Sequence, residues 1–311
     1  MSVTIRDPLY GMITIPKLCA RFLDTAEFER LRNIRQLGLC YYVFPSATHT
    51  RFEHCLGTCH LASLVCNELH HFISQREKDL VCLAAMWHDV GHMAFSHLMD
   101  SYLEECLQEQ KLVHHEARSV SALITANSRL QCLSDMEVKM VSKMILGDTA
   151  GESKPFLFEI VSNRRCGVDV DRLDYLQRDA YHTGHAGFQP DYIIKCVCIK
   201  NNQLAFKQKA EEELLNMFQT RRRLFRIIYH HKTTRKVEFL MQSTLNATQL
   251  SPQSMLDEWD TWDDYEMIVH MRKRCPKTFQ ILAARNFSAI PDQEATPDKD
   301  VNGYMEHLVF V

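Results

Sequence analysis

His88 and Asp89 lie side by side where an apolar helical segment ends, and this pair constrains the fold more than any other feature of the sequence. From Lys78 to His88, apolar residues recur at offsets of three and four, so the imidazole of His88 points toward the core side of the predicted helix. A buried imidazole without a partner is unfavourable, so other elements must converge on it. Gly91 follows closely and predicts a helix end or a tight turn near a ligand.

Helical periodicity extends over most of the chain. It also predicts a helix from Arg51 to Ile73 and a longer one from about Ala210 to His231. A short segment from Ile194 to Phe206 has a β pattern with a turn at Asn201-Asn202. The predicted fold is therefore mainly α, a helical bundle with one small β element.

The composition changes after about Gln249, where an acidic stretch with tryptophans is followed by a basic patch and a Pro/Asp-rich end. We expect residues 1–245 to form the helical core. We expect residues 246–311 to form a short, irregular α+β tail or partial lobe.

Two helical segments carry polar side chains that favour a site. Asp171, Tyr175 and Asp179 are spaced four residues apart and share one stripe. A solvated helix would show such a stripe too, but the two carboxylates and the tyrosine lie among further His and Arg residues. Arg221 interrupts an apolar face, and a buried arginine needs either a carboxylate partner or a bound phosphate.

The composition excludes several classes of protein. Of 311 residues, 46% are hydrophobic and 24% charged, which is ordinary for a soluble globular protein. The net charge of −3 excludes a general polycation strategy for nucleic acid, although a local basic cleft stays open. The twelve cysteines form no CxxC pair, and no apolar run reaches the roughly 18 residues that span a bilayer. We expect an intracellular protein, cytoplasmic or nuclear, with free thiols.

A divalent metal site is predicted at His54, His88, Asp89 and Asp171. Imidazoles and carboxylates together suit a transition metal, and Fe, Mn, Zn and Ni fit this set almost equally. Each ligand alone has a structural alternative, such as a helix cap for His54 or a surface carboxylate for Asp171. All four in this order, each on a helical pattern, are much harder to explain in that way.

A longer series of motifs resembles the SAM-and-HD-domain deoxynucleoside triphosphate (dNTP) triphosphohydrolases, the HD-domain dNTPases. The resemblance covers about residues 3–240 and implies an HD-domain helical bundle. The matching motifs are Asp7-Pro8, Phe28-Glu29-Arg30-Leu31-Arg32, Gln36-Leu37-Gly38, Tyr41-Tyr42-Val43-Phe44-Pro45, Arg51-Phe52-Glu53-His54, His88-Asp89-Val90-Gly91-His92, Phe95-Ser96-His97, His115-Glu116, Ile160-Val161-Ser162-Asn163 and Asp169-Val170-Asp171-Arg172-Leu173-Asp174-Tyr175.

The resemblance implies that water attacks the α-phosphorus of a dNTP and releases deoxynucleoside and inorganic triphosphate. It places four side chains at the phosphates: Arg51, His92, His97 and His115. His97 becomes the candidate proton donor to the leaving 5′-oxygen, and Asp179 is expected to orient it.

The resemblance also implies a substrate-binding set and a magnesium ion accompanying the nucleotide. Arg172, Tyr175, Arg221 and Tyr229 would bind the phosphates and the sugar, with Gln36 and Leu37 beside the sugar and base. Several cations and imidazoles around a metal suit a polyanionic triphosphate.

The sequence departs from the family pattern in two respects. We expect a shortened member without the SAM domain and without much of the C-terminal lobe that helps the family's active tetramer assemble. A homo-oligomer, dimer or tetramer, remains the expectation. In the activator pocket of nucleotide-activated members, Asp24 and Arg32 match, but Glu29 replaces a glutamine. An added carboxylate disfavours a polyanion, so GTP activation is doubtful.

Two alternatives remain open at this stage. Another HD phosphohydrolase, such as a nucleotidase, phosphomonoesterase or nuclease, could use the same metal ligands. A catalytically weak homologue that binds nucleotide for regulation is the third interpretation. The complete set of ligands and of His92 and His97 favours the dNTP hydrolase.

Overall fold

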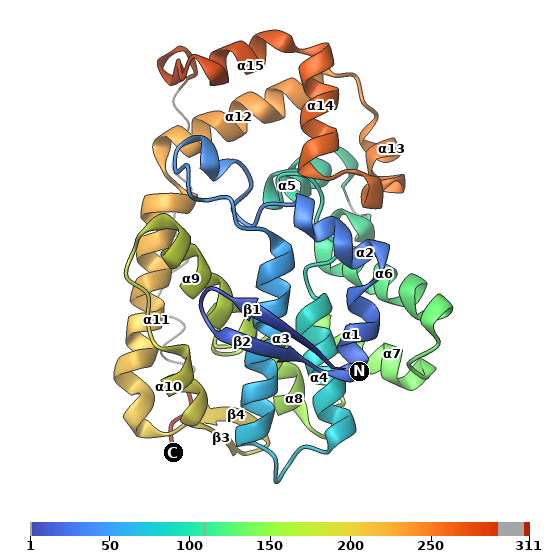
Figure 1. Cartoon of the computed structure of the whole chain (residues 1–311), viewed down its shortest axis with the longest axis vertical. Helices are drawn as coiled ribbons and strands as arrows, with labels where there is room; N and C mark the ends of the chain where they lie inside the picture. The colour runs from blue at the N-terminus through green and yellow to red at the C-terminus, as the bar shows by residue number, and fades with distance from the viewer. Residues whose placement is uncertain (1, 109, 292–307) are drawn as a thin grey trace.

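The computed structural model of the chain describes residues 2–108, 110–291 and 308–311, and helices dominate it (Figure 1). An N-terminal antiparallel hairpin, β1 (Val3–Asp7) and β2 (Gly11–Ile15), precedes the short helices α1 (Lys17–Leu23) and α2 (Ala26–Glu29). The body is then built from α3 (Arg51–Glu68), α4 (Gln75–Trp87), α5 (His97–Leu107), α6 (His115–Leu130), α7 (Asp135–Leu146), α8 (Pro155–Val161), α9 (Val170–Thr183), α10 (Pro190–Lys195) and α11 (Glu211–Leu224). The predicted mainly α fold is confirmed.

Helices α3 and α4 pack against each other in the middle of the body, and α9 packs on the other side of α3. Capping boxes fix where both central helices begin, with Thr50 and Glu53 at α3 and Ser74 and Glu77 at α4. Helix α3 ends at Glu68, before the predicted end, because the chain must turn before Ser74 can cap the next helix. Helices α3 and α9 carry His54 and Asp171, and His88 and Asp89 follow directly after α4.

The helix predicted from Ala210 to His231 is interrupted. Helix α11 ends at Leu224 and passes into one π-helical turn, Phe225–Tyr229, before α12 (Lys232–Ala247) begins. A π turn adds a residue to the repeat and changes the direction of the side chains that follow it; such turns are frequent at functional sites.

The β element is confirmed as the hairpin of β3 (Val197–Lys200) and β4 (Gln203–Phe206). Asn201 and Asn202 form its turn, with φ values of 52° and 60° that favour asparagine in a two-residue hairpin loop. The end of the chain returns to this hairpin, since Phe310 bridges in parallel to Phe206.

A second apolar cluster lies at the end of the molecule opposite the β3–β4 hairpin (Figure 1). It joins α5 and α12 to the tail helices α13 (Pro252–Asp257), α14 (Asp264–Arg274) and α15 (Pro276–Ala283). The division predicted after residue 245 stays a prediction, and residues 292–307 of the predicted tail lie outside the described residues.

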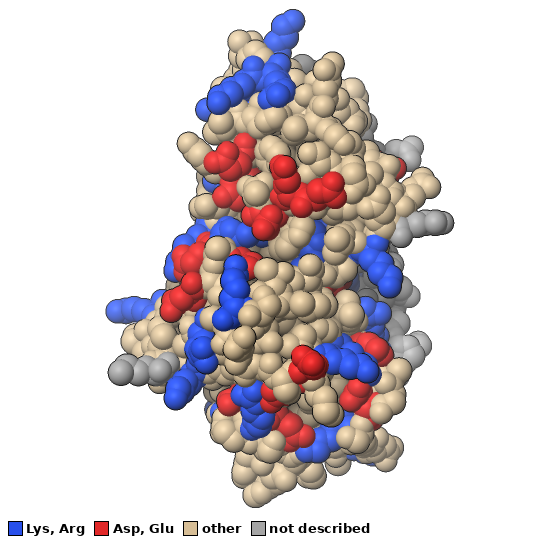
Figure 2. Space-filling model, turned by 90° about the vertical axis from the view of Figure 1, so that its right-hand side faces the viewer, with Lys and Arg blue, Asp and Glu red and all other residues tan. Residues whose placement is uncertain are grey.

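None of the helices in the described part of the chain is long and apolar enough to cross a membrane. All twelve cysteines are free, and most of them are buried. Figure 2 shows acidic and basic side chains interspersed over much of one face, with basic side chains gathered at its upper end. That face therefore presents no continuous basic path along its length.

Candidate active site

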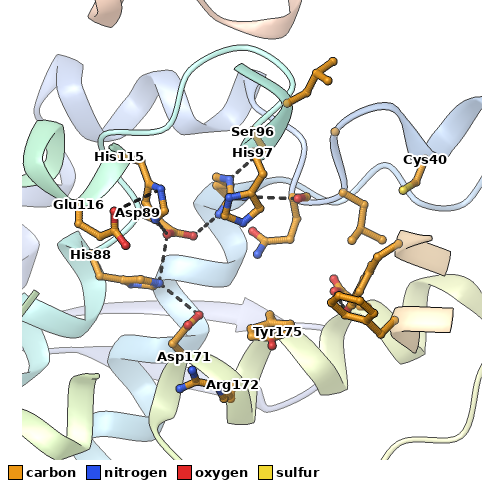
Figure 3. Close-up of a pocket in the computed structure, with 18 of the residues that line it drawn as sticks. Cys40, His88, Asp89, Ser96, His97, His115, Glu116, Asp171, Arg172 and Tyr175 are labelled. Carbon is orange, nitrogen blue, oxygen red and sulfur yellow. Dashed lines mark hydrogen bonds and ion pairs between the residues drawn. The ribbon is translucent and has the colours of Figure 1, made fainter. Parts of the chain in front are cut away.

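The four predicted metal ligands converge where α3, α4 and α9 meet (Figure 3 shows three of them). Nε2 of His54 lies 3.3 Å from Nε2 of His88 and 3.2 Å from Oδ1 of Asp171. Nε2 of His88 lies 3.3 Å from the same Asp171 oxygen and 3.4 Å from Oδ1 of Asp89. Donor atoms of His54, His88 and Asp89 all lie within 4.8 Å of one another, and the Asp171 carboxylate adjoins both histidines, so this set fits a single divalent metal ion.

The other nitrogen of each histidine is already occupied, which leaves both Nε2 atoms for the metal. Nδ1 of His54 lies 2.7 Å from Oδ2 of Asp174, and Nδ1 of His88 lies 2.8 Å from the carbonyl oxygen of Ala85. Both acceptors require a proton on Nδ1, so the Nε2 lone pairs point into the cluster. This arrangement fixes the tautomer that a ligand needs.

Asp174 is itself held by Arg178, whose Nε and Nη2 each lie 2.9 Å from its carboxylate oxygens. Burial opposes ionisation, but Arg178 and His54 lower the pKa of Asp174 to about 2. Arg178 also pairs with Asp7 of β1 at 3.0 Å. The N-terminal hairpin therefore contacts the side chain that positions Asp174.

Electrostatics keep the ligand carboxylates ionised. Burial alone would raise the pKa of Asp171, but His54 and His88 lower it. For Asp89, burial is again opposed, chiefly by the buried Arg51, which pairs with it directly, and the pKa falls well below its usual range. Negative charge is therefore available to a cation at ordinary pH.

A strained loop places the next group of residues. Phe95 and Ser96 have φ values of 61° and 57°, a left-handed backbone that side chains such as phenylalanine rarely adopt. Ser96 accepts a hydrogen bond from Nε of Arg51 at 2.9 Å and donates one to the carbonyl of Arg35 at 2.8 Å. These contacts stabilise the strained backbone of Phe95 and Ser96. Helix α5 begins directly after it, at His97.

His92, His97 and His115 gather around one carboxylate, Asp100. Nδ1 of His115 lies 2.9 Å from Oδ2 of Asp100, and Nδ1 of His97 lies 3.6 Å from the same oxygen. His92 is fully buried and stacks on His115 with ring centroids 3.8 Å apart. His97 is the exposed member, with 72% of its side chain accessible, so it can reach a substrate.

The expected pairing of Asp179 with His97 is corrected by the structure. Asp179 Oδ1 lies 2.7 Å from Nε2 of His49, and its Oδ2 accepts the Tyr229 hydroxyl at 2.6 Å. Among the residues described, the carboxylate beside His97 is instead Asp100, which is three positions along the same helix. That spacing was the sequence signal for Asp100, whereas nothing local indicated His49.

A cavity of about 560 Å³ opens beside the metal ligands, within the range of roughly 300–1,000 Å³ of small-molecule sites. The predicted substrate-binding residues all line it: Gln36, Leu37, Arg51, Arg172, Tyr175, Arg221 and Tyr229. His88, Asp89, Asp171, His97, His115 and Asp179 also line it, while His54 and His92 are not on its wall. Its lining thus combines metal ligands, cations and aromatic rings.

The three residues predicted for an activator nucleotide do not line this cavity. Nε of Arg32 pairs with Oε2 of Glu29 at 2.7 Å, and its guanidinium lies over the Phe52 ring at 3.5 Å. Asp24 forms the C-cap of α1. The Glu29 carboxylate therefore already pairs with Arg32, one of the two residues that match the activator pocket.

The helical fold and this two-histidine, two-aspartate cluster define an HD-domain protein, and comparison with known families agrees. The HD domain model matches residues 51–179, which span the first to the last element of the site. Residues 51 and 179 themselves line the cavity.

Relatives narrow the class further. The deoxynucleoside triphosphate triphosphohydrolase SAMHD1 homolog of Dictyostelium discoideum is 34% identical over 250 residues, 77% of this chain and 48% of that protein. Human SAMHD1, also named a deoxynucleoside triphosphate triphosphohydrolase, is 35% identical over 260 residues, 73% of this chain and 42% of that protein. The chain belongs to the HD-domain dNTPase family. It spans about half the length of the curated relatives it matches.

The fold has a solved counterpart. The crystal structure of a hypothetical protein from Aquifex aeolicus matches with a TM-score of 0.79 and 29% identity, covering 92% of this chain and 76% of that chain. The helical architecture therefore extends beyond the segment that carries the HD motifs.

Proposed function

We propose that this protein hydrolyses deoxynucleoside triphosphates to deoxynucleoside and inorganic triphosphate. The observation that carries the proposal is one cavity with a metal-ligand cluster, several cations and tyrosines on its wall. A triphosphate needs several positive groups, and a deoxyribose needs a close-fitting apolar surface. The family relationship supports the same substrate class.

His54, His88, Asp89 and Asp171 would hold one divalent metal, with Fe, Mn, Zn and Ni all compatible. A divalent metal there would polarise a phosphoryl oxygen and make water more acidic. Magnesium would accompany the nucleotide phosphates.

The protein's own groups then have separate tasks. Arg51, Arg172 and Arg221 face the cavity and would bind phosphate oxygens. His97 would donate a proton to the 5′-oxygen as its bond to the α-phosphorus breaks and water's oxygen bonds to that phosphorus. Asp100 would position His97 and His115, because it bonds His115 and lies near His97.

Tyr175 and Tyr229 would contact the sugar. Burial raises the pKa of Tyr175 to about 12, so its hydroxyl stays neutral beside the phosphates. A ring against the sugar can exclude a ribose 2′-hydroxyl by its bulk.

The further proposals follow from the family. We expect a homo-oligomer in an intracellular compartment, cytoplasmic or nuclear, consistent with twelve free cysteines. GTP activation is disfavoured by the Glu29–Arg32 pair.

The test is product identification with metal-replete protein, each dNTP in turn, with and without GTP, resolved by ion-exchange chromatography. Free triphosphate and deoxynucleoside, absent with a His88→Ala/Asp89→Ala double variant, would support the proposal. Inorganic phosphate or a nucleoside monophosphate would indicate another HD phosphohydrolase. Bound nucleotide without any product would favour a regulatory role.

A further inference from the structure

An ion pair outside the assigned machinery lines the same cavity. Arg235 and Glu238 lie one turn apart on α12, and Nη1 of Arg235 donates to Oε2 of Glu238 at 2.7 Å. Both side chains line the cavity, with 38% and 21% of their surfaces exposed.

The pair lies at the end of the cavity away from the metal ligands. Helix α12, which carries the pair, packs against Gly38–Tyr42, the segment that contains Cys40. Cys40 lies across the pocket from His88 and Asp171, with Tyr175 in between (Figure 3). With the phosphates at the metal, we assign the part of the cavity toward Cys40 and Glu238 to the base.

We propose that the Arg235–Glu238 pair reads the base of the bound dNTP and selects guanine. This inference rests on the proposed function, since it places the triphosphate at the metal end. It assigns to α12 a specificity role that is separate from hydrolysis.

Hydrogen-bond chemistry favours guanine over the other bases. A carboxylate has two acceptor oxygens, and Arg235 uses one of them, Oε2 of Glu238. Nε of Arg235 is buried and, in the described part of the chain, has no hydrogen-bond partner. The pair therefore sets an acceptor beside a cationic donor.

Guanine alone offers two adjacent donors, N1–H and the N2 amino group, beside the O6 acceptor. The N2 donor distinguishes it from adenine and thymine in the same way as in a DNA groove, and an arginine reads O6. Cytosine and adenine each have one amino donor, and thymine has one ring N–H. Each of these three bases still sets one donor beside an acceptor (N6–H and N7, N4–H and N3, N3–H and O4), so guanine is favoured by its additional donor to the carboxylate.

The experiment is internal competition. The full chain, loaded with metal, is given equal concentrations of the four dNTPs in one tube, and the four deoxynucleosides are quantified at early times. Their ratios equal the ratios of kcat/KM, and any activator in the mixture acts on all four substrates alike. The variants are Glu238→Gln and Arg235→Gln, with Glu137→Gln as a control that breaks an Arg–Glu pair with Arg76, away from the cavity.

Wild type and the Glu137→Gln control are expected to favour dGTP. Glu238→Gln should lower the dGTP preference about 10-fold, the difference between a charged and a neutral hydrogen bond. Arg235→Gln should reduce the same preference and keeps the test available if the first variant does not fold. Equal hydrolysis of all four dNTPs by wild type would overturn the proposed base selection but not the proposed function. Variants that slow hydrolysis of all four dNTPs equally would do the same. No triphosphate from any dNTP with wild type would overturn the proposed function, and with it this inference.

Discussion

Asp264 accepts the backbone N–H of Phe95 at 2.8 Å, so a residue of the tail helix α14 holds the strained loop that leads into His97. Its second oxygen accepts from the N–H and the guanidinium of Arg35, each at 3.2 Å. Burial raises the pKa of Asp264 to about 6, so these donors do not fully compensate its desolvation. The tail is thus connected to the proposed catalytic group.

We expect Asp264→Ala to lower kcat more than 10-fold while KM changes by less than about threefold. The variant leaves the Phe95 and Arg35 N–H groups unpaired, at a cost of about 1–3 kcal/mol each, and releases the loop. Steady-state kinetics and urea unfolding measure both effects. Thr278→Val is the matched control, because it removes a buried tail hydrogen bond to Thr244 that is remote from the loop. An equal loss of kcat in that control would mean that tail stability alone matters.

Asp100 and Asp179, which bond His115 and Tyr229 respectively, should contribute differently to catalysis. Asp100 bonds His115 beside His97, so Asp100→Asn should lower kcat about 10-fold. Asp179 bonds Tyr229 on the substrate wall, so Asp179→Asn should mainly raise KM. His97→Ala sets the scale, with an expected loss of about 100-fold or more in kcat. Michaelis–Menten analysis of the three variants would contradict this division if Asp179→Asn and Asp100→Asn had the same effect.

Asp174→Asn should lower the free energy of unfolding by about 3 kcal/mol. This is the lower end of the range for a broken buried ion pair, because Arg178 would still pair with Asp7. The pKa of Asp174 in the folded protein, about 2, lies below its ordinary value of 3.8. The stabilisation from Asp174 is therefore present above about pH 4 and is lost as the pH falls toward 2. Denaturant unfolding of metal-free protein at several pH values checks this. A difference that does not shrink on acidification would refute the linkage, and Asp191→Asn on the surface should have little effect.

Metal binding should stabilise the folded chain. At a free Mn²⁺ concentration about 100 times the dissociation constant, linkage gives about 2.7 kcal/mol, or roughly 5 °C in melting temperature. Thermal unfolding with Mn²⁺ and with a chelator measures the shift. The His88→Ala/Asp89→Ala variant should show no shift; a shift of equal size would place the metal elsewhere.

The four candidate metal ligands, which the structure brings close together, could be proposed from the sequence because their evidence is local. His54 and Asp171 lie on helices and His88 directly follows one, each with a periodicity visible in the sequence, and the order of the motifs supplied the rest. Helical spacing also indicated that Asp171, Tyr175 and Asp179 share a face, and all three line the cavity.

Features that depend on distant contacts were not predictable in this way. His49 meets Asp179 across 130 positions, and Asp264 meets Phe95 across 169. The π turn at Phe225–Tyr229 was missed because a single shifted repeat leaves a helical pattern almost unchanged. The partner of Asp179 was misassigned because helical spacing predicts which face a side chain lies on but not which distant residue it contacts.

The most direct test of the account is hydrolysis of a dNTP in ¹⁸O-labelled water, followed by mass spectrometry of the products. Attack of water on the α-phosphorus predicts one ¹⁸O atom in the released triphosphate and none in the deoxynucleoside. Label in inorganic phosphate, with a deoxynucleoside diphosphate as the other product, would place the attack at the terminal phosphorus and contradict the proposed function.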